Sequence, residues 1–380
     1  MIIGIDIRNI GKQRTGDETV FFNLVKKLAE IDNKNEYRLF TNITDTAELQ
    51  YVGVKLGVEN KANFKIISLK SANKFIWNLW TLPKYLNKNP VNIYHTQYIL
   101  PFFISRKIKL ITLIHDVSFR AYPELIKWSD RFFLKILIPW SLGRADKVLA
   151  VSEFTKKEIE KYYQISLEKI AVVPNSGGED LNMEIAPEEL NKVKEKYSLP
   201  EKFILYLGTM QPRKNILILM EALRGLKNSG WKLVLAGKRN DYNQDQKIEA
   251  IIKEFSLEKE VIFTGYVAEQ EKAALFKLAR VFCFPSLYEG FGIPILEAMR
   301  MGIPTIVSDI LPHREVAGDA ALYFSSQNAE ELKDRILRLE ENVDFREQLI
   351  QKAKTRVQFF SWKKTAEKTL EIYQKLGNKI

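Results

Sequence analysis

The sequence has few of the residues that form disulfides or bind transition metals. Of its 380 residues, one is cysteine, Cys283, and three are histidine. A single thiol excludes an intrachain disulfide, and three scattered histidines with one cysteine make no zinc set. Cys283 lies in the apolar run VFCFP, which predicts a small buried side chain. We therefore expect a reducing, cytoplasmic location and no catalytic metal site.

Long hydrophobic runs are also missing. No stretch of about 18 apolar residues occurs, so the sequence predicts no membrane-spanning helix. Its first residues, MIIGIDIR, resemble a strand rather than the charged and then apolar parts of a signal peptide. Acidic residues are missing locally: Asn60 to His115 holds nine Lys or Arg and no Asp or Glu, in a protein of net charge +11. Such a basic stretch needs an explanation of its own.

Short apolar runs of strand length alternate with helix-period segments along the chain. The runs in the first half are IIGIDI, YRLFTN, FKIISL, NIYHTQ, KLITLIHD, KVLAVS and IAVVPN. Those in the second half are FILYLG, KLVLAG, VIFTG, VFCFPS, PTIVSD and ALYFS. Short apolar strands with helical crossovers are typical of parallel sheets covered on both faces. The sequence thus predicts an α/β protein with two Rossmann-like, doubly wound domains that face each other across a cleft.

The seam between the two series is expected near 177–190, in the polar stretch SGGEDLNMEIAPEEL. We assign residues 1–183 to an N-terminal domain and residues 184–358 to a C-terminal domain. The last segment, 359–380, contains SWKKTAEKTLEIYQKL and predicts one amphipathic helix that packs back on the N-terminal domain.

The loops at the carboxyl ends of the strands are where such folds bind ligands. One of them, FCFPSLYEGFGIPILEAMRMG, reads as strand, turn and helix. Gly290 and Gly292 let the backbone approach a ligand, and the helix start offers an anion site. A carboxylate beside an anion site would repel it, so Glu289 and Glu297 are expected to accept hydrogen bonds from hydroxyl groups. The alternatives are a solvated loop acid for Glu289 and a helix-dipole partner for Glu297.

A second loop, YLGTMQPRKNI, follows a strand that ends at Gly208, and a helix is expected to begin near Asn215. Arg213 and Lys214 at that helix start would oppose its dipole, which favours anion binding over a solvated surface pair.

Two further loops carry weaker signals. His115 ends the strand KLITLIHD, where it would respond to a developing charge or serve as a structural histidine; His313 is expected at the surface. After the first strand, Arg14 and Gly16 are placed to meet phosphate at a helix start, although neither standard phosphate fingerprint occurs.

Together these motifs resemble a known family. EGFGIPILE (an acid, seven residues and an acid), GTMQPRKN, HD after a strand, VPN and SWKKTAEKTLEIY are similar to the family 4 retaining glycosyltransferases, in particular mannosyltransferase-like members. These enzymes have the two-domain GT-B architecture. The resemblance covers essentially the whole chain and is loosest in residues 40–90.

The resemblance implies a nucleoside-diphospho-sugar donor bound by the C-terminal domain. It assigns catalytic roles to four residues: His115 near the donor sugar, Arg213 and Lys214 at the diphosphate, and Glu289 facing the transferred sugar. It assigns donor binding to Gly16, Gly208, Thr209, Tyr266, Val267, Gly290, Phe291, Gly292, Ile293 and Glu297. Among these, Glu297 matches the acid that binds ribose, and Tyr266 and Val267 match the lining of the base pocket. Two departures are Thr209, where many relatives have a basic residue, and TGDET, which has fewer glycines than the common loop.

The implied activity is transfer of a hexose, mannose as the first candidate, with retention of anomeric configuration. The implied donor is GDP-mannose, or second a UDP-sugar, with no cofactor, and the acceptor is a glycan or lipid-linked hydroxyl in cell-surface polysaccharide synthesis. Alternatives of the same architecture are an epimerase, a phosphorylase-like enzyme or a non-catalytic nucleotide-sugar binder. No nucleic-acid-binding module is recognisable.

The acid-free stretch contains KFIWNLWTLPKYL. Its aromatic residues Trp77, Trp80 and Tyr85 stand among lysines, a composition typical of a membrane interface with anionic lipid. Residues 60–115 are therefore a candidate membrane surface, and the expected location is cytoplasmic and peripheral at the inner face of the membrane. A core helix with a solvated basic face is the alternative.

Overall fold

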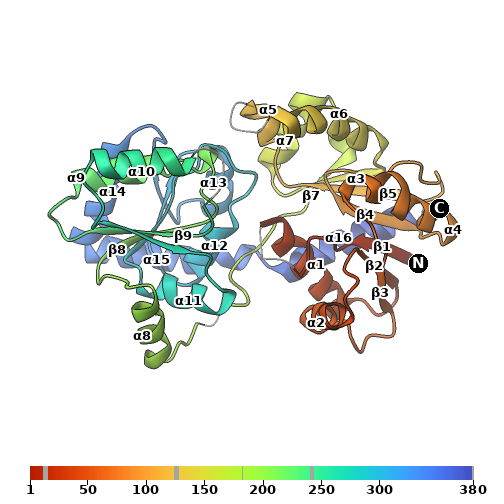
Figure 1. The fold of residues 1–380 in the computed structure, drawn as a ribbon, viewed down its shortest axis with the longest axis horizontal. Helices are drawn as coiled ribbons and strands as arrows, with labels where there is room; N and C mark the ends of the chain where they lie inside the picture. Colours follow the sequence, from red (N-terminus) through yellow and green to blue (C-terminus); the bar gives the residue numbers. More distant parts are fainter. Residues whose placement is uncertain (12–15, 124–127, 182, 240–243, 379–380) are drawn as a thin grey trace. The chain divides into compact units, whose positions relative to one another are not determined.

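The computed structural model describes residues 1–11, 16–123, 128–181, 183–239 and 244–378 (Figure 1). The chain forms two compact units. Unit 1 consists of Met1–Asn175 and Trp362–Ile380, and unit 2 consists of Ser176–Ser361. Each unit is built around its own parallel sheet.

The sheet of unit 1 has the strand order β3-β2-β1-β4-β5-β6-β7, and all of its neighbouring strands are parallel. Its strands are β1 (Ile2–Asp6), β2 (Glu36–Thr41), β3 (Phe64–Ser68), β4 (Ile93–Gln97), β5 (Lys109–Ile114), β6 (Lys147–Ala150) and β7 (Ile170–Val172).

The sheet of unit 2 has the order β10-β9-β8-β11-β12-β13 and is likewise parallel. Its strands are β8 (Phe203–Leu207), β9 (Lys232–Ala236), β10 (Val261–Gly265), β11 (Val281–Phe284), β12 (Thr305–Ser308) and β13 (Leu322–Phe324).

Helices connect the strands and cover the sheets. In unit 1 they are α1 (Gly16–Ile31), α2 (Thr46–Leu56), α3 (Lys74–Ile76), the π-helix η1 (Trp77–Thr81), α4 (Leu82–Lys88), α5 (Ser118–Ala121), α6 (Trp128–Arg144), α7 (Glu153–Tyr163), the 3₁₀ turn η3 (Leu167–Lys169) and α16 (Trp362–Gly377). In unit 2 they are α8 (Pro187–Lys196), the 3₁₀ turn η4 (Pro212–Lys214), α9 (Leu217–Gly225), α10 (Gln244–Glu254), α11 (Glu269–Leu278), α12 (Ile293–Arg300), α13 (Leu311–Ala317), α14 (Ala329–Glu341), α15 (Val343–Arg356) and the 3₁₀ turn η5 (Val357–Phe359).

The central strands are buried on both faces, which explains their unbroken apolar sequences. Every residue of β8 and β11 is buried, and Cys283 in β11 is fully buried, as the sequence predicts. Helices cover both faces of a parallel sheet, so neither face meets water. The strands are therefore apolar throughout instead of alternating between polar and apolar residues. The predicted α/β fold with two doubly wound sheets is confirmed.

The C-terminal helix α16 packs on α1 and β4 of unit 1. Its Trp362 and Tyr373 are buried, and the Tyr373 hydroxyl lies 2.6 Å from Nδ1 of His95 in β4. At the start of the helix, Thr365 Oγ1 donates to the carbonyl of Pro174, 2.7 Å away. The chain therefore returns from unit 2 to complete unit 1.

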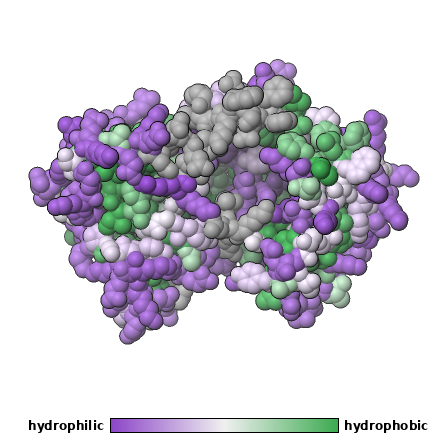
Figure 2. All heavy atoms as spheres, viewed as in Figure 1, coloured by the Kyte–Doolittle hydropathy of each residue, from purple (hydrophilic) through white to green (hydrophobic). Residues whose placement is uncertain are grey.

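No helix in the described part of the chain is long and apolar enough to cross a bilayer. Unit 1 does expose a cluster of large apolar side chains, however. We call it the apolar surface; its members are Phe75, Ile76, Leu79, Trp80 and Phe103, with Trp80 69% and Phe103 77% exposed. In Figure 2, green apolar side chains lie among purple polar ones over the region where Figure 1 places α3.

The expectation that Trp77, Trp80 and Tyr85 share an interfacial role is wrong for Trp77. Its ring is buried, with the guanidinium of Arg8 4.6 Å from the ring centroid. Tyr85 is half-buried and meets the edge of the Phe40 ring at a centroid distance of 5.7 Å. Trp80 is therefore the one exposed aromatic of the three.

Candidate functional site

The sheet of unit 2 reverses its strand order at β8 and β11, which are neighbours in the sheet. In doubly wound sheets, the loops that follow such a pair leave in opposite directions and open a crevice at the carboxyl edge. The loop after β8 begins at Gly208 and the loop after β11 begins at Pro285. A backbone hydrogen bond of 2.8 Å from Leu287 N to Arg213 O joins the two loops. Most of the predicted residues of unit 2 lie in this pair of loops.

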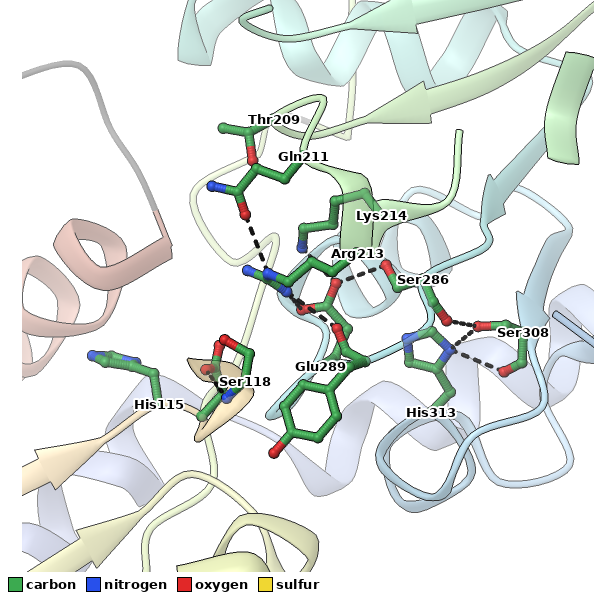
Figure 3. Close-up of polar contacts among 12 residues, drawn as sticks. His115, Ser118, Thr209, Gln211, Arg213, Lys214, Ser286, Glu289, Ser308 and His313 are labelled. Atoms are coloured by element: carbon green, nitrogen blue, oxygen red, sulfur yellow. Dashed lines mark hydrogen bonds and ion pairs between the residues drawn. The ribbon is translucent and has the colours of Figure 1, made fainter. Parts of the chain in front are cut away.

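Glu289 holds both predicted cations (Figure 3). Lys214 Nζ donates to its Oε1, and Arg213 Nη1 donates to its Oε2 at 3.0 Å. Arg213 is fixed further by bonds of 3.1 Å to the carbonyl of Tyr288 and to Oε1 of Gln211. We refer to Arg213, Lys214 and Glu289 as the cation clamp.

Lys214 and Glu289 are buried, with 9% and 7% exposed, and Arg213 is half-buried. Burial alone raises the pKa of Glu289, but Lys214 and Arg213 outweigh it and lower that pKa to about 2. Glu289 is therefore ionised at neutral pH, and the clamp has a net charge of +1. A buried site with one excess positive charge favours an anion.

One expectation about the clamp is wrong, and two of the alternatives are excluded. Arg213 and Lys214 do not open a helix; they lie in the 3₁₀ turn η4, and α9 begins at Leu217, so the helix-dipole argument does not apply. Nor is Glu289 a solvated loop acid or Lys214 a solvated surface cation. Side-chain pairing across the two loops, rather than the helix dipole, determines where the cations lie.

Behind the clamp runs a chain of polar side chains that sequence reasoning missed (Figure 3). Ser286 Oγ donates to Glu289 Oε1 at 2.7 Å, and Ser308 Oγ donates to the carbonyl of Ser286. His313 Nδ1 lies 3.0 Å from the carbonyl of Ser308, which only accepts, so Nδ1 carries the proton. This polar relay, Ser286, Ser308 and His313, ties α13 to the clamp.

His313 was expected at the surface and is fully buried. Its burial lowers its pKa to about 4, so the ring is neutral at pH 7. The sequence carried a signal for this position, because His313, Val316 and Ala317 have the spacing of one buried helix face. The serines had a signal too, since Ser286 and Ser308 stand at strand carboxyl ends.

The helix α12 begins beside the clamp. Gly292 precedes it with φ of +117°, and a Cβ there would lie 2.9 Å from Cδ1 of Ile295, so only glycine fits. Pro294 occupies the first turn. The first amide groups of a helix lack carbonyl partners within it and favour anions. Of the predicted segment from Gly290 to Ile293, the amides of Phe291 to Ile293 therefore stand at this helix start, in the loop that carries Glu289.

Glu297 lies one turn further along α12 and is 6% exposed. Lys272 Nζ, from α11, is 3.4 Å from its Oε1. The residues predicted for the base pocket, Tyr266 and Val267, directly follow β10; Tyr266 is 41% exposed and Val267 is buried. Gly208, with Thr209 next to it, directly follows β8, which ends at Leu207, one residue before the predicted end.

The remaining predicted residues belong to unit 1. His115 follows β5 and is buried, with Nε2 3.7 Å from Oδ1 of Asp17 and its ring centroid 5.6 Å from that of Tyr98. Gly16 is the first residue of α1, and a Cβ on it would meet no atom within 4 Å. Arg14 lies outside the described residues.

Two family models match the chain. The model described as Glycosyl transferases group 1 matches residues 187–356, and the one described as Glycosyltransferase Family 4 matches residues 14–176. The first covers the two loops of the clamp and α12, and the second covers His115 and Gly16.

Curated proteins that are similar in sequence, and a solved structure that is similar in fold, agree with these two matches. The chain is 30% identical over 289 residues to the O-antigen chain mannosyltransferase B of Escherichia coli, a match that covers 75% of this chain and 74% of that protein. It is 26% identical over 345 residues to the O-antigen chain mannosyltransferase RfbU of Salmonella typhimurium, covering 90% and 91%. The solved sucrose-phosphate synthase from Thermosynechococcus elongatus superposes with a TM-score of 0.76 at 20% identity, covering 100% of each chain, so the two share the GT-B fold.

Proposed function

Because the chain belongs to the family 4 glycosyltransferases, we propose that it transfers a hexose from a nucleoside-diphospho-sugar to a hydroxyl group of a glycan or lipid-linked acceptor. Mannose is the first candidate for the hexose, since both curated relatives described above are mannosyltransferases of O-antigen chains. Their names also support a role in cell-surface polysaccharide synthesis, in which the acceptor is a growing glycan.

The observation that carries the proposal is the buried cation clamp at the start of α12. A diphosphate needs several positive charges and N–H donors at one place, for which the candidates are Arg213, Lys214 and the backbone amides of Phe291 to Ile293 at the start of α12. With Glu289 ionised, the net charge of the clamp is +1. A bound diphosphate would therefore contact cations that are also paired with Glu289. Glu297, one turn along the same helix, is then a carboxylate for the ribose hydroxyls of the donor.

In the proposed reaction, the acceptor hydroxyl attacks the anomeric carbon on the face from which the diphosphate leaves. The leaving oxygen takes the hydroxyl proton, so the configuration is retained without an enzyme nucleophile. Arg213 and Lys214 stabilise the charge that develops on the diphosphate, which is why we propose a transfer that needs no metal ion. Glu289 orients both cations and keeps lone pairs for a hydroxyl of the transferred sugar, while His115 is assigned to that sugar by resemblance.

We further propose that the apolar surface of unit 1 rests on an anionic membrane. Its apolar side chains are surrounded by exposed basic ones, Lys74, Lys84, Lys88, Arg106 and Lys107, and residues 60–115 carry no acid. Positive charge beside exposed Trp and Phe complements a bilayer with anionic headgroups. A peripheral enzyme at such a surface would reach a lipid-linked acceptor.

Two hydrogen-bonded connections join the members of this surface. Asn87 in α4 donates from Nδ2 to the carbonyl of Phe103 at 2.8 Å and accepts from Ser105 N at 3.0 Å. Phe102 N donates to the carbonyl of Asn78, in the same π-helix as Trp80, at 2.8 Å. The ring of Phe102 stacks on Trp140 at a centroid distance of 4.0 Å, while Phe103 is exposed. Trp80 and Phe103 therefore belong to one continuous surface.

A thermal-shift panel of GDP, UDP and ADP, each free and as its sugar conjugate, tests the donor assignment. We expect GDP and GDP-mannose to raise the Tm most, with Lys214→Ala abolishing most of the shift. The control is Lys333→Ala, since Lys333 is paired with exposed Glu330 on α14 of the same unit. A larger shift with UDP would replace the base assignment, and no shift with any nucleotide would contradict the proposal as a whole.

A further inference from the structure

Lys272 lies between two acids that come from two different helices. Its Nζ is 2.8 Å from Oε1 of Glu269, one turn earlier on α11, and 3.4 Å from Oε1 of Glu297 on α12. Lys272 is the fourth residue of α11 and Glu297 the fifth of α12, so both stand near the helix starts that follow strand carboxyl ends. The pair thus lies at the binding edge of the sheet rather than at its far side.

The three side chains differ in how much they meet solvent. The side chain of Glu297 is 8% exposed, that of Lys272 15% and that of Glu269 30%, so the ion pair of Lys272 with Glu297 is largely shielded from water. Burial lowers the pKa of Lys272, but Glu297 and Glu269 raise it further, so the net effect is a raised pKa and a charged ammonium group. Two acids and one base leave this cluster with an excess negative charge.

The stem of Glu297 packs against the backbone of Gly177. A Cβ on Gly177 would lie 2.8 Å from the carbonyl oxygen of Ile293 and 3.3 Å from Cγ of Glu297, so the chain passes closer than any side chain permits. Arg300 Nε donates to the carbonyl of Gly177 at 2.9 Å and holds this strand of backbone against α12. With the stem held there, the remaining freedom of Glu297 is the rotation of its carboxylate.

Lys272 restrains that rotation. Among the described residues, Lys272 is the one whose side chain donates a hydrogen bond to the Glu297 carboxylate, and the oxygen that accepts it is Oε1. The other oxygen, Oε2, keeps its lone pairs for an outside donor. Oε2 has two lone-pair sites, so it can accept a hydrogen bond from one or from both of two vicinal hydroxyl groups.

We propose that Lys272 is a positioning residue that sets the Glu297 carboxylate to receive the ribose hydroxyls of the nucleotide. This inference rests on the proposed function, in which Glu297 binds ribose, and adds the residue that orients it. A purely structural bridge between α11 and α12 would stabilise the fold but would not discriminate between ribose and deoxyribose.

That difference defines the experiment. Isothermal titration calorimetry gives the Kd of GDP and of 2′-deoxy-GDP (UDP and 2′-deoxy-UDP if the panel selects uridine) for the whole protein. We expect the wild type to prefer the ribonucleotide by about tenfold, the effect of one hydrogen bond to a charged group. Lys272→Met should reduce the preference to about threefold or less, and Lys272→Arg should keep it. Lys277→Met, on the exposed face of the same helix, is the matched control and should leave it unchanged.

The ratio of the two dissociation constants does not depend on the folded fraction of a variant, so a loss of stability would not change it. Lys272→Gln provides a second, polar replacement. The inference is overturned if Lys272→Met and Lys272→Gln keep the wild-type preference while Glu297→Gln loses it. If Glu297→Gln also keeps it, or if the wild type has no preference, the ribose assignment itself fails, which is a failure of the proposed function.

Discussion

Arg213 Nη1 lies 3.0 Å from Oε2 of Glu289, so the cation expected to bind phosphate is already paired with the acid expected to bind sugar. Lys214 bonds the other oxygen of the same carboxylate. One carboxylate thus fixes two cations from a loop 75 residues away in sequence. The protein itself thus holds the two cations in place, which is the arrangement that the proposed stabilisation of a leaving diphosphate requires.

Removing one cation of the clamp should affect turnover more than folding. We expect Lys214→Ala to lower kcat/KM by about 10²–10³-fold, because it removes a charge that stabilises the leaving diphosphate. Steady-state kinetics with the donor identified by the thermal-shift panel measures this loss, and Lys333→Ala should retain the wild-type value. Wild-type turnover in Lys214→Ala would show that the leaving group is stabilised elsewhere.

Removing the acid of the clamp should instead affect folding. Glu289→Gln leaves Lys214 and Arg213 buried without a counter-charge, so we expect the free energy of unfolding to fall by about 3–5 kcal/mol. The comparison is Glu330→Gln, whose partner Lys333 is on the surface and whose loss should cost about 0–1 kcal/mol. Urea unfolding measures both. Equal losses in the two variants would mean that the clamp is not a buried charge network.

The strands were predictable because the strands of a parallel sheet are buried on both faces and therefore occur in the sequence as short apolar runs between helices. The carboxyl-end rule then selected two loops that the structure joins, so Arg213, Lys214 and Glu289 were found as candidates. Their pairing was not predictable, since hydrophobic periodicity carries no information about which side chains meet across two loops. The same limit explains His313, whose burial comes from the packing of α13, and Trp77, which faces inward beneath Arg8 while Trp80 faces water.

The polar relay predicts a dependence of stability on pH. Burial lowers the pKa of His313 to about 4 from an ordinary value of 6.5, with Glu289 and Lys214 as the charged groups that act on it. Between these values the unfolded chain binds a proton that the folded chain does not. Stability must therefore rise with pH across this window and be lost as pH falls from 6.5 toward 4.

The variant His313→Asn isolates this effect, because an amide still donates to the Ser308 carbonyl but does not titrate. Between about pH 7 and about pH 4.5 the wild type should lose up to about 3 kcal/mol more stability than the variant. Urea unfolding at a series of pH values measures the difference. His95, whose pKa is also lowered, to about 3, is present in both proteins and cancels. If the stabilities of the wild type and the variant changed with pH in the same way, His313 would bind its proton as readily in the folded protein as in the unfolded chain.

The apolar surface of unit 1 predicts salt-sensitive binding to anionic vesicles. The wild type should float with vesicles that contain phosphatidylglycerol and not with pure phosphatidylcholine, because nine basic residues and no acid lie between Asn60 and His115. Raising the salt concentration should weaken this binding, since a large part of it is electrostatic.

The exposed aromatic residues separate insertion from mere charge attraction. Trp80→Ser and Phe103→Ser should each weaken binding by roughly tenfold, the effect of leaving one large apolar side chain in water. Phe359→Ser is the matched control, because Phe359 is 63% exposed but belongs to unit 2. If salt abolished binding while Trp80→Ser did not change it, the surface would attract lipid headgroups without entering them. If Phe359→Ser weakened vesicle binding as much as Trp80→Ser, the contact with the membrane would not be specific to unit 1. Residues 60–115 would then be a solvated basic face.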